Sequence, residues 1–221
     1  PAGAYNWTIG ADHQHNNRDA VLRSSMWMPM MSTWGPWMEA AFIWPDVDIK
    51  QTGLFAETER ELGAAARMRA GLRVDLVEAR ANKAGEEPAA MGIQSPNALY
   101  ESKYGVIADT HEETNVGGFL RYDRDFAGRD AGWFAVLSRS VRTADATERF
   151  VARKGKMPAM DWVGNPDLDP EVHHQLELGA NTAKASWSMA GSVFYDTVGD
   201  YILKQAGSSG TLYTNVDAVL Y

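Results

Sequence analysis

The clearest pattern in the chain is a strict alternation of apolar and polar residues in segment 67–76. The apolar set is Met68, Ala70, Leu72, Val74 and Leu76, and the intervening set is Arg67, Arg69, Gly71, Arg73 and Asp75. A period of two places the two sets on opposite faces of a strand, whereas a helix would scatter both around its circumference. The segment is therefore predicted to be an amphipathic β-strand with one purely apolar face.

The same alternation recurs in segments 115–123 and 175–180. Less regular strands, rich in aromatic and β-branched residues, are predicted at 5–14, 48–60, 132–140, 186–203 and 212–221. No segment approaches the 18 or so uninterrupted apolar residues of a spanning helix, so a membrane role would have to come through strands. The predicted fold class is all-β, with about eight strands.

The predicted connections fall into a short class and a long class that alternate along the chain. Short connections are expected near 61–64, 127–131 and 181–183, and long ones near 15–47, 81–113 and 141–169. Outer-membrane barrels pair short periplasmic turns with long extracellular loops, whereas a soluble sandwich has no reason for this asymmetry. The alternation favours part of an antiparallel transmembrane β-barrel.

In a barrel of this kind, the charged face of segment 67–76 points into the lumen and the apolar face meets lipid. A soluble sheet, with its apolar face on a core and its charges in water, explains any single strand equally well. Aromatic residues at strand ends fit either interfacial girdles or ordinary strand packing. They are Trp7, Tyr122, Trp133, Trp187, Tyr195 and Tyr201.

Composition removes several classes of function. The chain has 221 residues, 45% of them hydrophobic and 23% charged, and it contains no cysteine. The net charge of −8 and the lack of a basic stripe argue against a nucleic-acid partner. The sequence contains no Gly-x-Ser-x-Gly elbow, phosphate-binding glycine loop or His-Glu-x-x-His motif, so no enzymatic activity is predicted.

Several motifs together resemble the barrel of TonB-dependent receptors. Residues 137–150 read LSRSVRTADATERF, residues 162–171 read WVGNPDLDPE, and residues 174–179 lead into an alternating strand. The pattern Asn-Pro-x-Leu-x-Pro-Glu before such a strand is widespread in that family. Segments 51–57, 70–75, 194–202 and 215–218 extend the resemblance over nearly the whole chain. The 138–149 run and the Trp-Val-Gly-Asn-Pro-Asp phrase most resemble the copper-receptor branch.

The resemblance implies a location in the outer membrane of a Gram-negative bacterium, with lipid as a neighbour. It also implies a barrel of roughly 22 strands filled by an N-terminal plug, through which the receptor would contact TonB. Residues 1–221 would then form part of the barrel domain. The chain opens at Pro1 and stops at Tyr221 within a predicted strand, so the plug domain and the C-terminal strands are expected to lie outside it.

A methionine-rich segment supplies candidate metal ligands. They are Met26, Met28, Met30 and Met31, preceded along the chain by His13 and His15. Thioethers suit Cu(I) and imidazole accepts either copper oxidation state. The alternative is adaptable apolar packing, because these methionines are interleaved with tryptophans. The histidines share strand parity with Trp7 and Ile9, which predicts that they point outward from the barrel.

Three functions remain open at this point. The first is TonB-dependent uptake of copper or a copper complex, with copper as transported substrate and no cofactor. The second is uptake of an iron-siderophore through aromatic and arginine-lined loops. The third, from another class, is a soluble β-rich binding module that uses its tryptophans as a platform.

Overall fold

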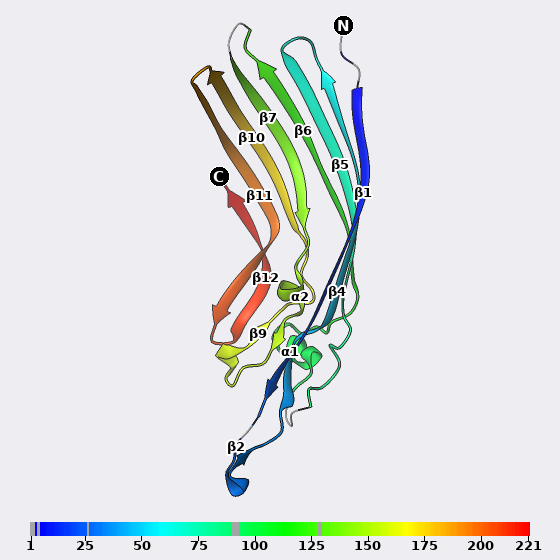
Figure 1. The fold of residues 1–221 in the computed structure, drawn as a ribbon, viewed down its shortest axis with the longest axis vertical. Helices are drawn as coiled ribbons and strands as arrows, with labels where there is room; N and C mark the ends of the chain where they lie inside the picture. Colours follow the sequence, from blue (N-terminus) through cyan, green and yellow to red (C-terminus); the bar gives the residue numbers. More distant parts are fainter. Residues whose placement is uncertain (1–2, 4, 26, 90–92, 128–129) are drawn as a thin grey trace.

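The computed structural model describes residues 3, 5–25, 27–89, 93–127 and 130–221. Eight long strands form one curved antiparallel sheet (Figure 1). In order across the sheet, they are β1 (Tyr5–Ser24), β4 (Met38–Glu61), β5 (Ala66–Ala81), β6 (His111–Asp125), β7 (Ala131–Arg142), β10 (Glu171–Lys184), β11 (Trp187–Gly207) and β12 (Gly210–Leu220). The prediction of about eight strands in a partial barrel is confirmed.

Two short strands continue the sheet beyond β12. β9 (Trp162–Val163) pairs in parallel with β12 at Thr211, and β8 (Ala152–Arg153) pairs with β9. Within the described residues the sheet is therefore open, with β1 at one edge and β8 at the other. A separate two-stranded sheet pairs β2 (Trp27–Met28) with β3 (Thr33–Trp34).

The register of the sheet separates its side chains into an apolar face and a charged face. Leu54 of β4 lies opposite Val74 of β5, which in turn lies opposite Val116 of β6. All three side chains are exposed on the convex face, as are Leu72 and Leu137. Because side chains alternate along a strand, the charged residues of β5 lie on the concave face. The inward direction predicted for Arg67, Arg69, Arg73 and Asp75 is confirmed.

Connections at the two ends of the sheet differ in length. Residues 62–65 and 185–186 form short connections at one end, where the β6–β7 connection also lies. At the other end lie segments 25–37, 82–110 and 143–170, together with the short β11–β12 turn. The predicted separation of short turns and long loops is confirmed, with the β11–β12 turn as a short connection at the long-loop end.

The predicted long connection at 15–47 is wrong in extent, because most of it is strand. β1 continues to Ser24 and β4 begins at Met38, and the two pair along this whole length. The pairing is irregular between Arg18 and Val21. This arm projects beyond the apolar part of the sheet and ends at β2 (Figure 1). A strand pair in water needs no continuous apolar face, so the alternation that marks the other strands is missing here.

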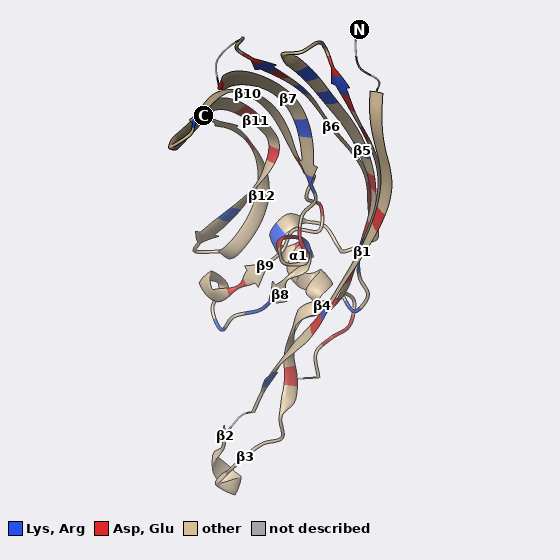
Figure 2. Ribbon diagram, turned by 45° about the horizontal axis from the view of Figure 1, so that its top comes forward, with Lys and Arg blue, Asp and Glu red and all other residues tan. Residues whose placement is uncertain are grey.

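The loops at this end fold back against the concave face of the sheet. α1 (Pro96–Tyr104), α2 (Ala146–Phe150), β8 and β9 lie within the curve of the strands (Figure 2). The buried apolar core forms at this contact, where Val47 and Ala79 of the wall pack with Phe150 of α2. Among the described residues, no helix is long and apolar enough to cross a membrane.

Candidate functional site

A group of ion pairs lines the concave face across β1, β4 and β5, the first three strands of the sheet. The Arg73 guanidinium donates to Asp12 Oδ2 at 2.6 Å and to Asp75 Oδ2 at 2.8 Å. Gln51 Nε2 donates to the same Asp75 carboxylate at 2.9 Å. These contacts join β1, β4 and β5 through side chains as well as backbone, and they leave a polar lumen wall.

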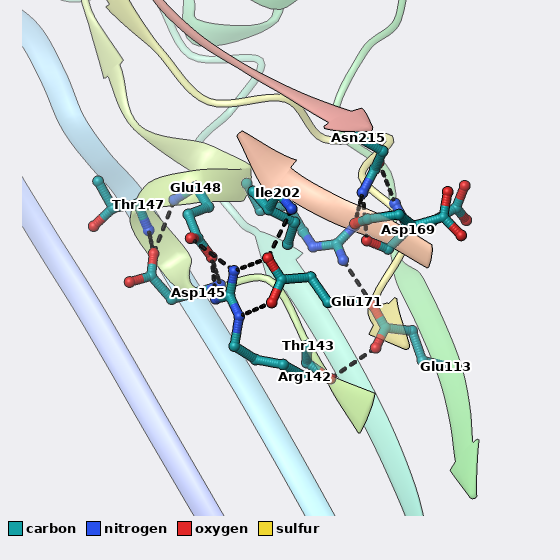
Figure 3. A network of polar contacts seen from close by, with 12 residues as sticks. Glu113, Arg142, Thr143, Asp145, Thr147, Glu148, Asp169, Glu171, Ile202 and Asn215 are labelled. Atoms are coloured by element: carbon teal, nitrogen blue, oxygen red, sulfur yellow. Dashed lines mark hydrogen bonds and ion pairs between the residues drawn. The ribbon is translucent and has the colours of Figure 1, made fainter. Parts of the chain in front are cut away.

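A second polar network ties the loops to the barrel mouth (Figure 3). Arg142, the last residue of β7, lies between two carboxylates. It contacts Glu171 at 2.6 and 2.8 Å and Glu148 at 2.8 and 3.2 Å. Glu171 also accepts the backbone N–H of Ile202 at 2.7 Å. The start of β10, the end of β7, α2 and β11 are therefore held together by one cluster of charges.

The helix α2 is positioned by its own capping residues. Asp145 accepts the backbone N–H groups of Thr147 and Glu148 at 2.6 and 2.8 Å, and Glu148 accepts the Asp145 N–H at 2.8 Å. This reciprocal capping box satisfies donors that a helix start leaves open. It also aims Glu148 at Arg142, so the Asp-Ala-Thr-Glu motif has a structural role in building the network.

A buried ion pair joins α2 to β6. Arg149 is fully buried, and its Nη2 donates to Glu113 Oε1 at 2.7 Å while Nη1 donates to the Pro166 carbonyl at 3.0 Å. Glu113 Oε2 also accepts hydrogen bonds from Asn115 Nδ2 at 3.0 Å and from Thr143 Oγ1 at 2.8 Å. The pair links loop 143–170 to the first residues of β6.

Two tyrosines anchor the other long loop from α1. The Tyr100 hydroxyl donates to the Phe150 carbonyl at 2.6 Å, and the Tyr104 hydroxyl donates to the Val163 carbonyl at 2.9 Å. Burial raises the pKa of Tyr104 to about 12, so the hydroxyl stays a donor at physiological pH. Loops 82–110 and 143–170 thus form one packed layer, called the mouth layer below.

The Asn-Pro-Asp-Leu-Asp-Pro-Glu segment has a structural role within this layer. Asn165 Oδ1 accepts the Asp167 N–H at 3.0 Å, and Asn215 Oδ1 of β12 accepts the Asp169 N–H at 3.0 Å. Leu168 is fully buried between these turns. These contacts fix the turns that lead into β10. Sequence reasoning missed the roles of Arg142 and Arg149, whose partners lie in distant segments.

The methionines lie at the tip of the β1–β4 arm. Met28 ends β2, and Met30 and Met31 belong to the 3-10 turn η1 (Pro29–Met31), with both of these side chains exposed. Met26 lies outside the described residues. Trp27 and Trp34 pack edge to face across the β2–β3 pair with ring centroids 5.7 Å apart. The tip therefore presents thioethers and aromatic rings together to the exterior.

The two histidines do not join this cluster. His13 Nδ1 contacts Thr52 Oγ1 at 2.9 Å, and His15 Nε2 contacts Asp48 Oδ1 at 2.6 Å, both on the convex face. This confirms their predicted outward direction. Within β1, the nine residue steps from His15 to Ser24 span on the order of 30 Å at about 3.3 Å per residue, and the tip lies beyond Ser24. Among the described residues, no three His, Asp or Glu side chains are grouped to hold a metal.

These features define the class of protein: a curved antiparallel sheet with an apolar convex face, a charged concave face and long loops at one end is the wall of an outer-membrane β-barrel. The chain belongs to the TonB-dependent receptor family, because the model described as "TonB dependent receptor-like, beta-barrel" matches residues 2–221. Its location is accordingly the outer membrane of Gram-negative bacteria.

Solved structures agree with this fold. A structure titled "Copper transporter OprC" is 24% identical with a TM-score of 0.70, covering 97% of this chain and 30% of that one. A double mutant of the hemophore receptor HasR of Serratia marcescens, solved in complex with its hemophore HasA and heme, is 16% identical with a TM-score of 0.60. This match covers 97% of this chain and 37% of that one. The chain thus spans about a third of these structures. The search of curated proteins finds no match.

Proposed function

We propose that this chain supplies wall strands and external loops to a TonB-dependent receptor that takes up copper or a copper complex across the outer membrane. The family match over residues 2–221 carries the receptor part of the proposal. In the intact receptor, residues 1–221 would be part of the barrel domain, and a plug domain would contact TonB. Family membership in an outer-membrane receptor class argues against the soluble binding module.

The methionine-rich tip supports copper as the substrate. Met30 and Met31 are exposed at the far end of an arm that projects from the barrel. Soft thioether donors select Cu(I) over the hard cations that are more abundant outside a cell. The structural likeness to a protein titled as a copper transporter points the same way. The histidines, which face outward far from this tip, are not included in the proposed site.

A metal chelate is the second candidate substrate, and the tryptophans favour it. Trp27, Trp34 and Trp37 are all exposed around the same tip. Flat aromatic surfaces suit an organic ring system such as a siderophore or a porphyrin, and the structural neighbour HasR is titled as a complex with a hemophore and heme. Growth and uptake under copper starvation compared with iron starvation distinguish the two substrates.

Titration of the intact receptor with Cu(I), against a competing chelator, tests the copper site. Replacing Met28, Met30 and Met31 with leucine keeps side-chain volume and removes the soft donors. We expect affinity to fall by at least about tenfold, since even outer-shell changes at metal sites have effects of that size. The matched control replaces Met157 and Met160, which are exposed in another loop. Equal affinity of both variants and the parent would remove the tip from the hypothesis.

A further inference from the structure

The arm formed by β1 and β4 is irregular where it leaves the barrel wall. From Tyr5 to Arg18 the two strands pair without a shift in register, but between Arg18 and Ser24 the register shifts three times. The pairs that bound this segment are Arg18 with Val47 and Ser24 with Met38. Over this segment β4 therefore carries three more residues than β1. Each bulge of this kind bends the strand and can re-aim a side chain.

The first bulge attaches the arm to the loop that carries α1. Pro45 and Asp46 both lie opposite Asp19, and Asp46 has a left-handed backbone with a φ of 51°. Proline has no N–H to donate across the pair. The carbonyls of Pro45 and Asp46 accept the backbone N–H groups of Lys83 and Asn82, respectively, each at 3.0 Å. Lys83 Nζ also contacts Asp19 Oδ2 at 2.7 Å. β4 is therefore bound to the loop at the level where its pairing with β1 is interrupted.

The second bulge seats Ile43 in the mouth layer. Ile43 falls between two cross-strand pairs, Trp44 with Ala20 and Phe42 with Val21. Its half-buried side chain packs against a core that joins loop 143–170 to β11 and β12. The buried members of this core are Ala144, Val151, Leu168, Ile202 and Tyr213. The extra residue in β4 thus inserts the arm into the same layer that closes the barrel mouth.

Polar contacts on β1 reinforce this seat. Arg18 Nη1 donates to Thr147 Oγ1 of α2 at 3.0 Å. The pair of Asp19 and Lys83 lies in water, with side chains 40% and 33% exposed, so the pair is weak and the packing of Ile43 is the stronger link. Toward the tip, the next apolar residue of β1, Leu22, is already exposed. Both long loops therefore hold the arm at its root and leave its far part free.

We propose that the root of the arm is a coupling element, in which Ile43 joins the arm and the mouth layer into one cooperative unit. When loop 143–170 leaves the wall, Ile43 loses its seat and the arm is free to change its angle to the barrel. Displacement of the arm opens the same seat from the other side. Because such coupling is reciprocal, each movement favours the other. A ligand held at the methionine tip would then bias the mouth layer, a consequence that rests on the proposed function, whereas the coupling itself does not.

Two measurements on the intact receptor test the coupling. Trypsin cleavage at Arg153 and Lys156 reports the opening of loop 143–170. A pair of spin labels reports the angle of the arm through the distribution of distances between them. The labelled positions are Thr33→Cys at the tip and Glu112→Cys on the wall, both of which are exposed. The chain has no cysteine, so labels attach within it only where cysteines are introduced. In the parent we expect slow cleavage and a narrow distance distribution.

Ile43→Ala should change both measurements together. Loss of the packed side chain should raise the cleavage rate by at least about tenfold and broaden the distance distribution. Ile43→Val is a smaller truncation that keeps most of the packing, so it should lie between Ile43→Ala and the parent in both measurements. Leu22→Ala is the matched control, because it truncates an exposed apolar residue of the same arm. This control should keep the parental cleavage rate and distance distribution.

The reverse direction uses Arg149→Met, which acts on α2 and changes no residue of the arm. It should broaden the same distance distribution as it opens loop 143–170. Heat-modifiable electrophoretic migration checks that every variant keeps a folded barrel. The proposal is overturned by a parental cleavage rate in Ile43→Ala, by a broad distribution in the parent, or by an unchanged distribution in a folded variant whose loop is cleaved faster. Neither measurement uses copper, so failure of the coupling and failure of the proposed function are separate results.

Discussion

The buried pair of Arg149 and Glu113 should control whether the mouth layer stays closed against the wall. Arg149→Met removes the cation and leaves the Glu113 carboxylate, which is 5% exposed, without its charged partner. Methionine fills a similar elongated space without placing another polar group there. The change is confined to the interior of the layer, since Arg149 itself is fully buried.

The expected loss of the free energy that holds the loop closed differs between removing one charge of a buried pair and replacing both. Removing one partner of a buried pair costs about 3–5 kcal/mol when the remaining charge is left unpaired. Asn115 and Thr143 still donate hydrogen bonds to Glu113, so the low end of that range, about 3 kcal/mol, is expected here. The second variant, Arg149→Met/Glu113→Leu, removes both charges and should recover much of this loss. The double variant should also gain some stability because it removes Arg149 Nε, a buried donor that has no acceptor among the described residues. At 1.4 kcal/mol per factor of ten, 3 kcal/mol corresponds to roughly a hundredfold change in opening.

Limited proteolysis of the intact receptor on whole cells measures this opening. Arg153 and Lys156 are exposed in loop 143–170 and supply trypsin sites outside the membrane. When opening is fast relative to cleavage, the cleavage rate reports the population of the open loop. Arg149→Met should raise that rate by up to about a hundredfold, and the double variant should lie much nearer the parent.

Two results would refute this reasoning. Parental cleavage rates for Arg149→Met would show that the pair does not hold the loop closed. If trypsin cleaved the double variant as fast as Arg149→Met, lost packing would cause the effect, and not the carboxylate left without its arginine. Arg153→Gln serves as the control for loss of a trypsin site, because Arg153 is exposed and makes no ion pair within the described chain.

Three more predictions follow from the wall and the mouth layer. Leu72→Arg on the convex face should destabilise the barrel by about 2–4 kcal/mol in urea unfolding from bilayers, whereas Leu72→Ile should cost under about 1.5 kcal/mol; equal stabilities would contradict a lipid-facing position. Gly164→Ala should open loop 143–170 to trypsin, because its added carbon would lie 2.6 Å from the Arg149 carbonyl carbon; an unchanged rate would show that the backbone can shift. Asp161 is buried, and although burial opposes its ionisation, Lys103 and other partners lower its pKa. Because its folded-state pKa is depressed, Asp161 contributes stability to the closed loop above its unfolded pKa, and this stability is lost as the pH falls through the folded-state pKa. Cleavage by pepsin, which needs no trypsin site, should therefore rise in the parent as the pH falls. In Asp161→Asn the cleavage rate should depend less on pH.

The strands of the wall could be predicted from local patterns because their two faces meet different solvents. In β5, one face meets lipid and the other a polar lumen, so apolar and charged residues must alternate at period two. The arm formed by the end of β1 and the start of β4 lies outside the membrane, where most of its side chains meet water and Ala41, Phe42 and Val47 of β4 are buried. No such alternation is required there, so the sequence pattern did not show that residues 15–24 and 38–47 are strands.

The sequence by itself determined the membrane-facing strands, the family and the presence of a methionine-rich segment, since alternation, motifs and composition are local properties. Only the tertiary structure decided which of these residues meet. It separated His13 and His15 from the methionine tip, because strand pairing fixes their distance along the arm. It also brought Arg149 to Glu113 and Arg142 to Glu171, across segments far apart in the chain. Such pairs arise from the way loops fold back into the barrel mouth, a long-range arrangement that leaves no periodic pattern in the sequence.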